Sequence, residues 1–126
     1  MKKLIQLICL LTMAVGMAFM VAPAKADTLT FPIKSSYDYE IRLEFYSPSR
    51  NLYWPGNNRS WLLDDYQAHN YKLNCRRGEK ICYGAWEVEG DLQWGVGHGY
   101  SQTCTNCCYT CKAGNTSTKL INLTGN

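Results

Sequence analysis

The sequence predicts an all-β domain, a small antiparallel sandwich or barrel of about six or seven short strands that is stapled by disulfides. Apolar and polar residues alternate along several short segments, most clearly in residues 37–46. Turn-forming residues recur about every ten residues, and no window has the periodicity of a helix. Six cysteines and 15 aromatic side chains follow residue 26. Aromatic residues favour strands, and an even set of cysteines suits a disulfide framework.

Residues 1–26 have the three parts of a secretory signal peptide. Lys2 and Lys3 precede a long apolar run, and Ala24-Lys25-Ala26 supplies small residues for a signal peptidase. We expect cleavage after Ala26, a secreted or periplasmic protein, and one domain over residues 27–126. A retained membrane anchor is the alternative, since the apolar run is nearly long enough to span a bilayer.

The formal net charge of +3 comes from this leader, because the rest of the chain carries ten basic and ten acidic side chains. A neutral chain lacks the basic excess of a polyanion-binding protein, so we expect no nucleic-acid partner. No later stretch is apolar enough to cross a bilayer, so we expect the mature protein not to span a membrane.

The strands are expected in the following order. Residues 27–36 should lead into a first strand at residues 37–46, where Tyr37, Tyr39, Ile41, Leu43 and Phe45 share one face. Turns are expected at residues 47–51, 54–58, 64–65 and 76–79. Further strands are expected at residues 60–63, 69–75, 80–88, 92–100 and 119–123.

Gly90 and Asp91 are expected to form a two-residue hairpin loop with Gly90 at positive φ, which places Ala85 opposite Val96. The core face would then carry Ile81, Tyr83, Ala85, Trp94, Val96, His98 and Tyr100. The other face would carry Cys82, Trp86 and a strip of glycines at 84, 95, 97 and 99. Such a strip indicates close approach of a cover. The Trp86 ring, the cysteine-rich segment and a flat ligand all remain open as that cover.

Four cysteines crowd into residues 104–111, and Cys75 and Cys82 complete the set of six. The adjacent Cys107 and Cys108 should take different partners. Cys75 and Cys82 could bridge each other across a turn, or each could reach a cysteine among Cys104, Cys107, Cys108 and Cys111. The position of Cys82 on the glycine face favours the second pattern. The Cys-x-x-Cys spacing also suits a zinc or redox site, although an oxidising compartment favours structural disulfides.

The best surface candidate for ligand binding is the loop of residues 50–61. Its Tyr53, Trp54 and Trp61 alternate with amide and guanidinium donors such as Arg50, a combination that suits sugar rings or a protein partner. The alternative is that Trp54 and Trp61 enter the core. Trp86, beside the glycine strip, and His98, on the opposite face, are further candidates for ligand binding. The alternative for His98 is a core histidine hydrogen-bonded to Tyr83.

The run Cys82-Tyr83-Gly84-Ala85-Trp86, then Trp94-Gly95-Val96-Gly97, then Cys-x-x-Cys-Cys-x-x-Cys resembles a group of small exported, cysteine-rich bacterial proteins without an assigned activity. Trp54-Pro55-Gly56 belongs to the same pattern. The resemblance implies an exported, disulfide-stapled protein and brings no catalytic or binding residues with it.

No nucleophile elbow, P-loop or dinucleotide fingerprint occurs in the sequence, so we expect no enzymatic activity and no cofactor. The sequence favours an exported binding module for a glycan or a protein partner, in the cell envelope or the medium. The alternative function is a thiol-based metal-binding or redox protein that uses residues 104–111.

Overall fold

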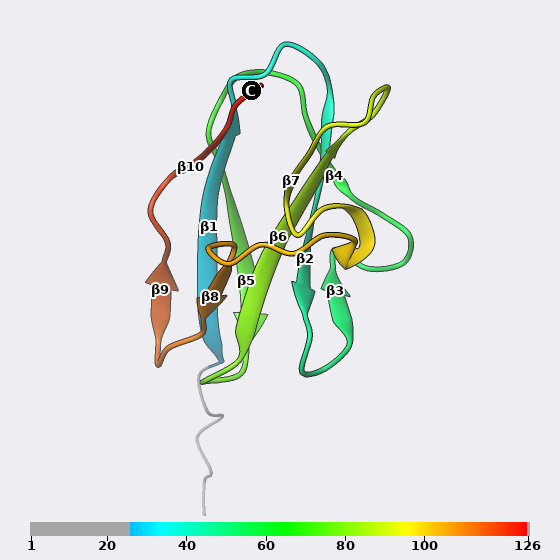
Figure 1. Ribbon diagram of the computed structural model, residues 1–126. Helices are drawn as coiled ribbons and strands as arrows, with labels where there is room; N and C mark the ends of the chain where they lie inside the picture. The colour runs from blue at the N-terminus through cyan, green and yellow to red at the C-terminus, as the bar shows by residue number, and fades with distance from the viewer. Residues whose placement is uncertain (1–25, 126) are drawn as a thin grey trace, which may run out of the picture.

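Two β-sheets pack face to face in residues 26–125, which are the residues that the computed structural model describes (Figure 1). The predicted signal peptide therefore lies outside the described residues, apart from Ala26. The first sheet, sheet A, contains β1 (Asp27–Ser35), β5 (His69–Cys75), β9 (Asn115–Ser117) and β10 (Ile121–Leu123). Sheet B contains β2 (Ile41–Ser47), β3 (Leu52–Trp54), β4 (Trp61–Leu63), β6 (Lys80–Glu87), β7 (Gln93–Gly95) and β8 (Cys108–Thr110). The all-β, disulfide-stapled fold class is confirmed.

Each sheet is organised around long strands with short partners at their edges. In sheet A, β1 pairs antiparallel with β5, and its other edge pairs in parallel with β9 and then β10. In sheet B, β2 and β6 form the antiparallel centre. β3 and β4 share the free edge of β2, and β7 and β8 share the free edge of β6.

The expected leader at residues 27–36 is wrong, because these residues form β1. Leu29, Phe31 and Ile33 alternate inward and are at most 4% exposed. The first strand predicted from residue 37 starts at Ile41 instead, and Tyr37 and Tyr39 lie in the connection before it. Pro32 has no N–H to donate, but it does not interrupt β1. On this edge of β1, β9 pairs with residues 28–30 and β10 with residues 33–35, so Pro32 lies between the two partner strands.

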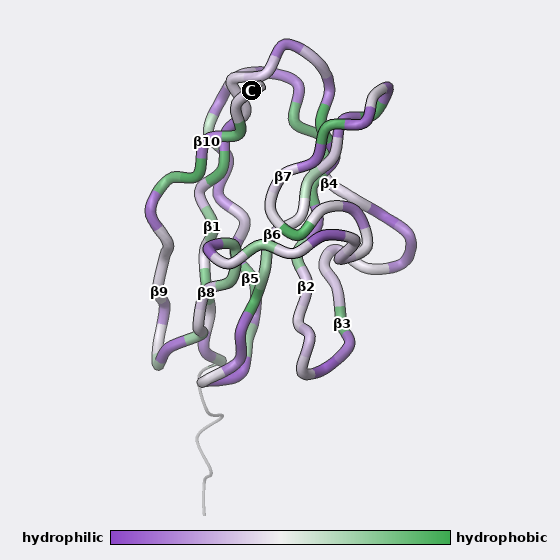
Figure 2. The backbone as a smooth tube through the Cα atoms, in the orientation of Figure 1, coloured by the Kyte–Doolittle hydropathy of each residue, from purple (hydrophilic) through white to green (hydrophobic). Residues whose placement is uncertain are grey.

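The main core lies between the sheets and brings together the inward residues of both. Phe31 meets Phe45 with ring centroids 4.6 Å apart, and Ile33, Leu43 and Ile81 are fully buried. Figure 2 shows hydrophobic residues recurring along the paired strands and hydrophilic residues at the connecting turns. The alternation in the sequence thus specifies one buried face on each central strand.

A second, smaller cluster covers the outer face of sheet B. It contains Tyr46, Cys82, Val96 and Cys107, all at most 9% exposed. Sheet B is therefore covered on both faces in this region, on its inner face by sheet A and on its outer face by the segment after β7.

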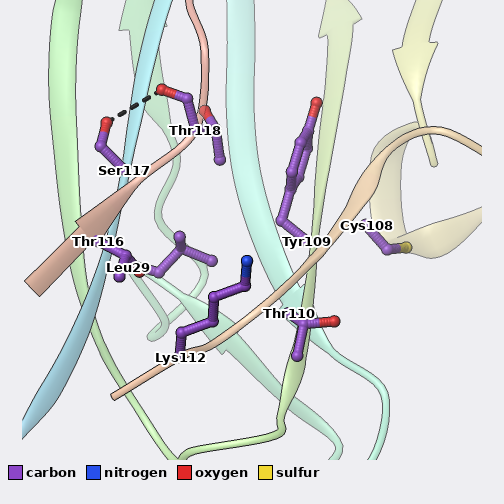
Figure 3. Close-up of a pocket in the computed structure, with 8 residues that line it drawn as sticks. All are labelled: Leu29, Cys108, Tyr109, Thr110, Lys112, Thr116, Ser117 and Thr118. Atoms are coloured by element: carbon purple, nitrogen blue, oxygen red, sulfur yellow. Dashed lines mark hydrogen bonds between the residues drawn. The ribbon is translucent and has the colours of Figure 1, made fainter. Parts of the chain in front are cut away.

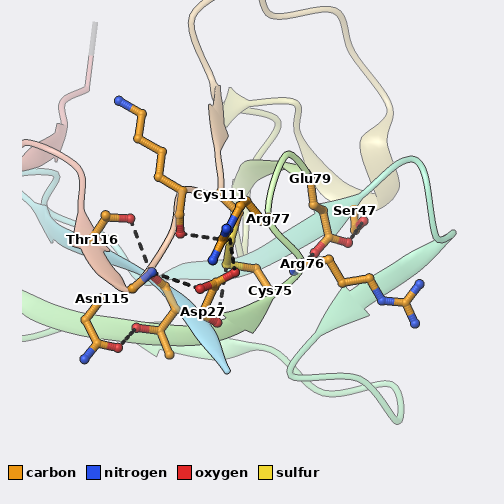
Figure 4. Close-up of a disulfide and its surroundings, with 12 residues drawn as sticks. Asp27, Ser47, Cys75, Arg76, Arg77, Glu79, Cys111, Asn115 and Thr116 are labelled. Carbon is orange, nitrogen blue, oxygen red and sulfur yellow. Dashed lines mark hydrogen bonds and ion pairs between the residues drawn. A yellow bond between two sulfur atoms is a disulfide. The ribbon is translucent and has the colours of Figure 1, made fainter. Parts of the chain in front are cut away.

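Three disulfides join the six cysteines, and the pattern confirms the second of the two predicted arrangements. Cys75 pairs with Cys111, Cys82 with Cys108, and Cys104 with Cys107. The other predicted arrangement, a bridge between Cys75 and Cys82, is wrong. Cys75 ends β5 in sheet A, whereas Cys82 lies inside β6 in sheet B. Cys75–Cys111 ties the two sheets together at one end of the sandwich (Figure 4). Such bonds are characteristic of oxidising compartments.

Strands β3, β8 and β9 have no counterpart among the predicted strands, and Trp54 of β3 lies in the turn that was expected at residues 54–58. Each contains three residues, too few for an alternating pattern to be visible. Among residues 26–125, no helix is long and apolar enough to cross a membrane.

The three disulfides should contribute unequally to stability, because they close loops of different length in the unfolded chain. Cys75 and Cys111 are 36 residues apart, whereas Cys104 and Cys107 are 3 apart. Replacing both members of the first pair by alanine should cost about 4 kcal/mol of unfolding free energy, and replacing the second pair about 2 kcal/mol. Urea unfolding measures the loss of unfolding free energy in each variant, and equal losses would contradict the loop-length explanation.

Candidate functional site

The hairpin between β6 and β7 has a longer loop than expected. Ala85 lies opposite Trp94 rather than Val96, so the predicted register is wrong by two residues. The Glu87 N–H donates to the Leu92 carbonyl, which leaves four residues in the loop instead of two. Gly90 does not have a positive φ, so the predicted type II′ turn is absent. Because side chains alternate with a period of two, the shift leaves Ala85 and Trp94 on the inner face and Trp86 on the outer face, as predicted.

The strand expected over residues 92–100 ends at Gly95. Gly95, Gly97 and Gly99 have φ values of 62°, 72° and 65°, which bend the chain out of the sheet and into a short 3-10 turn at His98–Tyr100. Three residues predicted on the core face are therefore displaced. Val96 is buried in the second cluster, and His98 and Tyr100 are exposed.

The predicted glycine strip is not formed on one face, because Gly97 and Gly99 lie in the segment after β7. The cover over Gly84 is the backbone of that segment. A Cβ atom on Gly84 would lie 2.2 Å from the Gly97 carbonyl oxygen and 2.8 Å from the Tyr46 ring. Only a residue without a side chain allows this approach. The predicted close approach is confirmed, but the group over Gly84 is neither the Trp86 ring nor a cysteine.

The predicted site residues of the 50–61 loop separate onto the two faces of sheet B. Trp54 and Trp61 point inward and pack partly buried against the main core. Trp61 lies 5.1 Å from Tyr71 and 5.6 Å from Phe45 between ring centroids. Tyr53 is opposite Tyr46 and packs against the second cluster on the outer face. The structure thus places the two tryptophans against the main core and Tyr53 on the outer face of sheet B.

Arg50 is held by a carboxylate rather than left free for a ligand. Its guanidinium forms an ion pair and two hydrogen bonds with Glu79, whose side chain is 3% exposed. Ser47 also donates to Glu79, as does the Arg76 backbone N–H (Figure 4). Burial alone would raise the pKa of Glu79, but these hydrogen bonds outweigh it and lower the pKa to about 2. The network fixes the β2–β3 turn against the β5–β6 turn.

His98 lies on Trp86 and not beside Tyr83 in the core. The two rings are stacked, with centroids 3.9 Å apart and planes 17° apart. The backbone N–H of His98 donates to the side-chain oxygen of Gln93, which also accepts a hydrogen bond from the Ser101 hydroxyl. This stack covers one face of the Trp86 ring and anchors the 3-10 turn over the outer face of sheet B.

A groove with three tyrosines lies where the 3-10 turn meets the β2–β3 connection. We call it the tyrosine groove. Its volume is about 440 Å³, and it is lined by Tyr46, Ser47, Pro48, Asn51, Leu52, Tyr53, Gly99 and Tyr100. The Tyr46 ring stands at 89° to Tyr100 and at 31° to Tyr53. None of these lining side chains carries a charge.

Hydrogen bonds hold two tyrosines of the groove, Tyr46 and Tyr53, in place. Tyr46 donates its hydroxyl proton to the buried carboxylate of Glu44 and accepts a hydrogen bond from the Gly99 N–H. Burial, and then the bond to Glu44, raises the pKa of Tyr46, so its hydroxyl stays protonated. The Tyr53 hydroxyl accepts from the Asn58 N–H at 2.7 Å. Tyr100 has a φ of 62°, a conformation that is uncommon for a residue with a bulky side chain.

The sequence patterns point to Tyr53 but not to Tyr46 or Tyr100. Tyr46 ends the clearest alternating segment, on the face opposite to Phe45, which is a usable signal. Tyr100 falls on the core face only when the strand is extended past Gly95. The structure brings Tyr53 and Tyr46 together on the face that also carries Trp86 and His98.

The turn expected at residues 64–65 is present in the structure. A carboxylate oxygen of Asp65 lies 2.9 Å from Nε2 of His69, and both side chains are exposed. Residues 26–125 contain no group of three or more His, Cys, Asp or Glu side chains that could hold a metal ion. No family model, curated protein or solved structure matches this chain.

The Glu79 network predicts loss of stability in acid. The carboxyl has a folded pKa of about 2 against an ordinary value of 4.5. Its contribution is therefore complete above about pH 5 and disappears as the pH falls toward 2, by roughly 3 kcal/mol. Urea unfolding at several pH values should show this slope, and Glu79→Gln should flatten it. Glu40→Gln, an exposed control, should leave the slope unchanged; a Glu79→Gln slope equal to that of the parent would refute the assignment.

Close packing over β6 predicts a specific effect of adding one methyl group. Gly84→Ala should push the 96–100 segment off the sheet and cost about 1–3 kcal/mol. Thermal unfolding and the near-ultraviolet circular dichroism of the Trp86–His98 stack report the two effects. Gly90→Ala is the control, because its Cβ meets only the end of the Glu87 side chain. An unchanged aromatic signal in Gly84→Ala would contradict the proposed contact.

Proposed function

We propose that the protein is an exported, non-enzymatic binding module of the cell envelope or the surrounding medium that recognises a neutral glycan in the tyrosine groove. The observation that carries this proposal is the convergence of Tyr46, Tyr53 and Tyr100, from three separate segments, around one uncharged groove. Such convergence of aromatic walls with few polar groups is typical of ligand sites.

A carbohydrate suits the chemistry of the groove. The apolar faces of sugar rings pack against aromatic rings, while the hydroxyls of Tyr53 and Tyr100 and the amide of Asn51 offer hydrogen bonds to sugar hydroxyls. The absence of a charged lining side chain favours a neutral sugar over an acidic one, because an anion would lose its water without gaining a counter-charge.

The groove is largely pre-formed, which lowers the entropy lost on binding. One wall is fixed by the Arg50–Glu79 network at the β2–β3 turn. The other wall is fixed by the Gly99–Tyr46 hydrogen bond and the Trp86–His98 stack. A rigid site of this kind binds without rearrangement of the sheet.

Export is supported by the disulfide framework together with the signal-like composition of residues 1–26. The alternative function, a thiol-based metal or redox protein, needs thiolates. All six cysteines of residues 26–125 are paired in disulfides, which favours the binding module over a metal site held by thiolates.

A glycan array with the purified protein tests the proposal. We expect binding to neutral oligosaccharides, and a loss of affinity of about tenfold or more in Tyr100→Ala, since truncating an aromatic anchor commonly costs more than 1 kcal/mol. Tyr39→Ala is the matched control, because Tyr39 is 66% exposed and lies outside the groove.

Three results would count against the glycan site. They are an array without hits, binding that Tyr100→Ala leaves unchanged, and a protein partner that competes at the same groove without any sugar. Melting temperatures of both variants should stay close to that of the parent, which separates a binding defect from a folding defect.

A further inference from the structure

A second hollow lies away from the tyrosine groove, along the open side of the sandwich. It measures about 610 Å³ and runs between β8 of sheet B and β9 of sheet A (Figure 3). Leu29 and Tyr109 form its apolar part. Lys112 extends into the space between them, and three hydroxyl residues, Thr116, Ser117 and Thr118, border the β9 side.

Strand β8 presents an unpaired backbone edge to this hollow. Cys107 and Cys111 are hydrogen-bonded to Tyr83 and Glu79 at the two ends of its pairing with β6. In an antiparallel pair, alternate residues direct their N–H and C=O groups toward the partner strand. Tyr109 therefore directs its backbone N–H and C=O groups toward β6. Cys108 and Thr110 direct theirs outward, away from β6. In the part of the chain that the structure describes, β8 pairs with β6 alone.

Strand β9 has an open edge in the same way. Gly114 and Thr118 are bonded to β1 through the Thr28 N–H and the Thr30 carbonyl. Asn115 and Ser117 lie at the alternate positions and direct their backbone groups away from β1. The hollow is thus bordered by the exposed hydrogen-bonding edges of both sheets, which is the arrangement that an added strand can extend.

The charge at this edge favours an acidic occupant. Lys112 is the only charged side chain that lines the hollow, and it forms no ion pair within residues 26–125. A lysine at an open edge also disfavours indiscriminate strand pairing. A sugar is a poorer fit here, because the Tyr109 ring packs edge-on against Phe31 at 5.5 Å and is committed to the core.

From these observations we infer that the open edge of β8 is a second binding site, which takes an extended peptide carrying an acidic residue. The peptide adds as a strand beside β8, bonds to the outward backbone groups of Cys108 and Thr110, and places its carboxylate at Lys112. This site is independent of the tyrosine groove and does not depend on glycan binding.

The probe is a displayed library of random peptides of about seven residues with one fixed aspartate, selected on the purified protein. Enriched peptides are then synthesised and titrated by fluorescence anisotropy and by amide chemical shifts. We expect the largest shifts at Cys108, Thr110 and Lys112. No enrichment over a surface without protein would overturn the inference.

Two substitutions test the two kinds of contact. Thr110→Pro removes an outward N–H that the fold does not use, so it should weaken peptide binding by about tenfold while the pairing with β6 persists. Lys112→Glu should weaken binding by about tenfold through charge reversal. Lys119→Glu is the matched control, because Lys119 is exposed and does not line the hollow.

The remaining outcomes are also decisive. Peptides that bind Lys112→Glu and Thr110→Pro as tightly as the parent would refute the site. Peptides whose binding is lost in Tyr100→Ala instead would assign them to the tyrosine groove. Acidic oligosaccharides that shift the same amides and displace the peptides would replace the peptide with a sugar as the natural ligand. Melting temperatures close to that of the parent confirm that each variant is folded.

Discussion

The close approach of Gly97 to Gly84 is the contact on which the outer face of sheet B depends. Because Gly84 has no side chain, the backbone after β7 can cross directly over β6, with the Gly97 carbonyl in the space that a Cβ would fill. From this position the Gly99 N–H reaches Tyr46, and His98 stacks on Trp86. The Cys82–Cys108 disulfide then returns the chain to the sheet, so the crossing segment is fixed at both ends.

This arrangement gives sheet B two faces with different tasks. Along β2 and β3 successive side chains alternate, so Phe45 and Trp54 enter the main core while Tyr46 and Tyr53 form the outer surface. The inner aromatics supply apolar burial, which stabilises the fold. The outer ones keep polar hydroxyls beside apolar rings, a combination suited to recognition. Arg50, which the sequence suggests as a ligand contact, contributes by holding the turn that forms one wall of the groove.

Charge is distributed unevenly although the chain after residue 26 is neutral. Figure 1 shows the β1–β2, β4–β5 and β6–β7 connections meeting at one end of the sandwich. These connections and the adjoining end of β6 hold seven of the ten carboxylates, namely Asp38, Glu40, Asp64, Asp65, Glu87, Glu89 and Asp91. The two proposed sites lie elsewhere, in the tyrosine groove and at the open edge of β8. An acidic peptide that reaches Lys112 therefore does not have to approach through the acidic loops.

Local sequence patterns are sufficient to predict the β class, the inward alternation of β2 and β5, the two faces of β6 and the need for a close cover over Gly84. These features follow from a period of two, missing side chains and turn residues. Four features cannot be predicted in this way: the strand at residues 27–35, the shift of the hairpin register by two residues, the pairing of the cysteines, and the meeting of Tyr100 with Tyr53. Each of these depends on contacts between distant segments. In particular, a two-residue change of register keeps every side chain on its face, so the alternation alone cannot detect it.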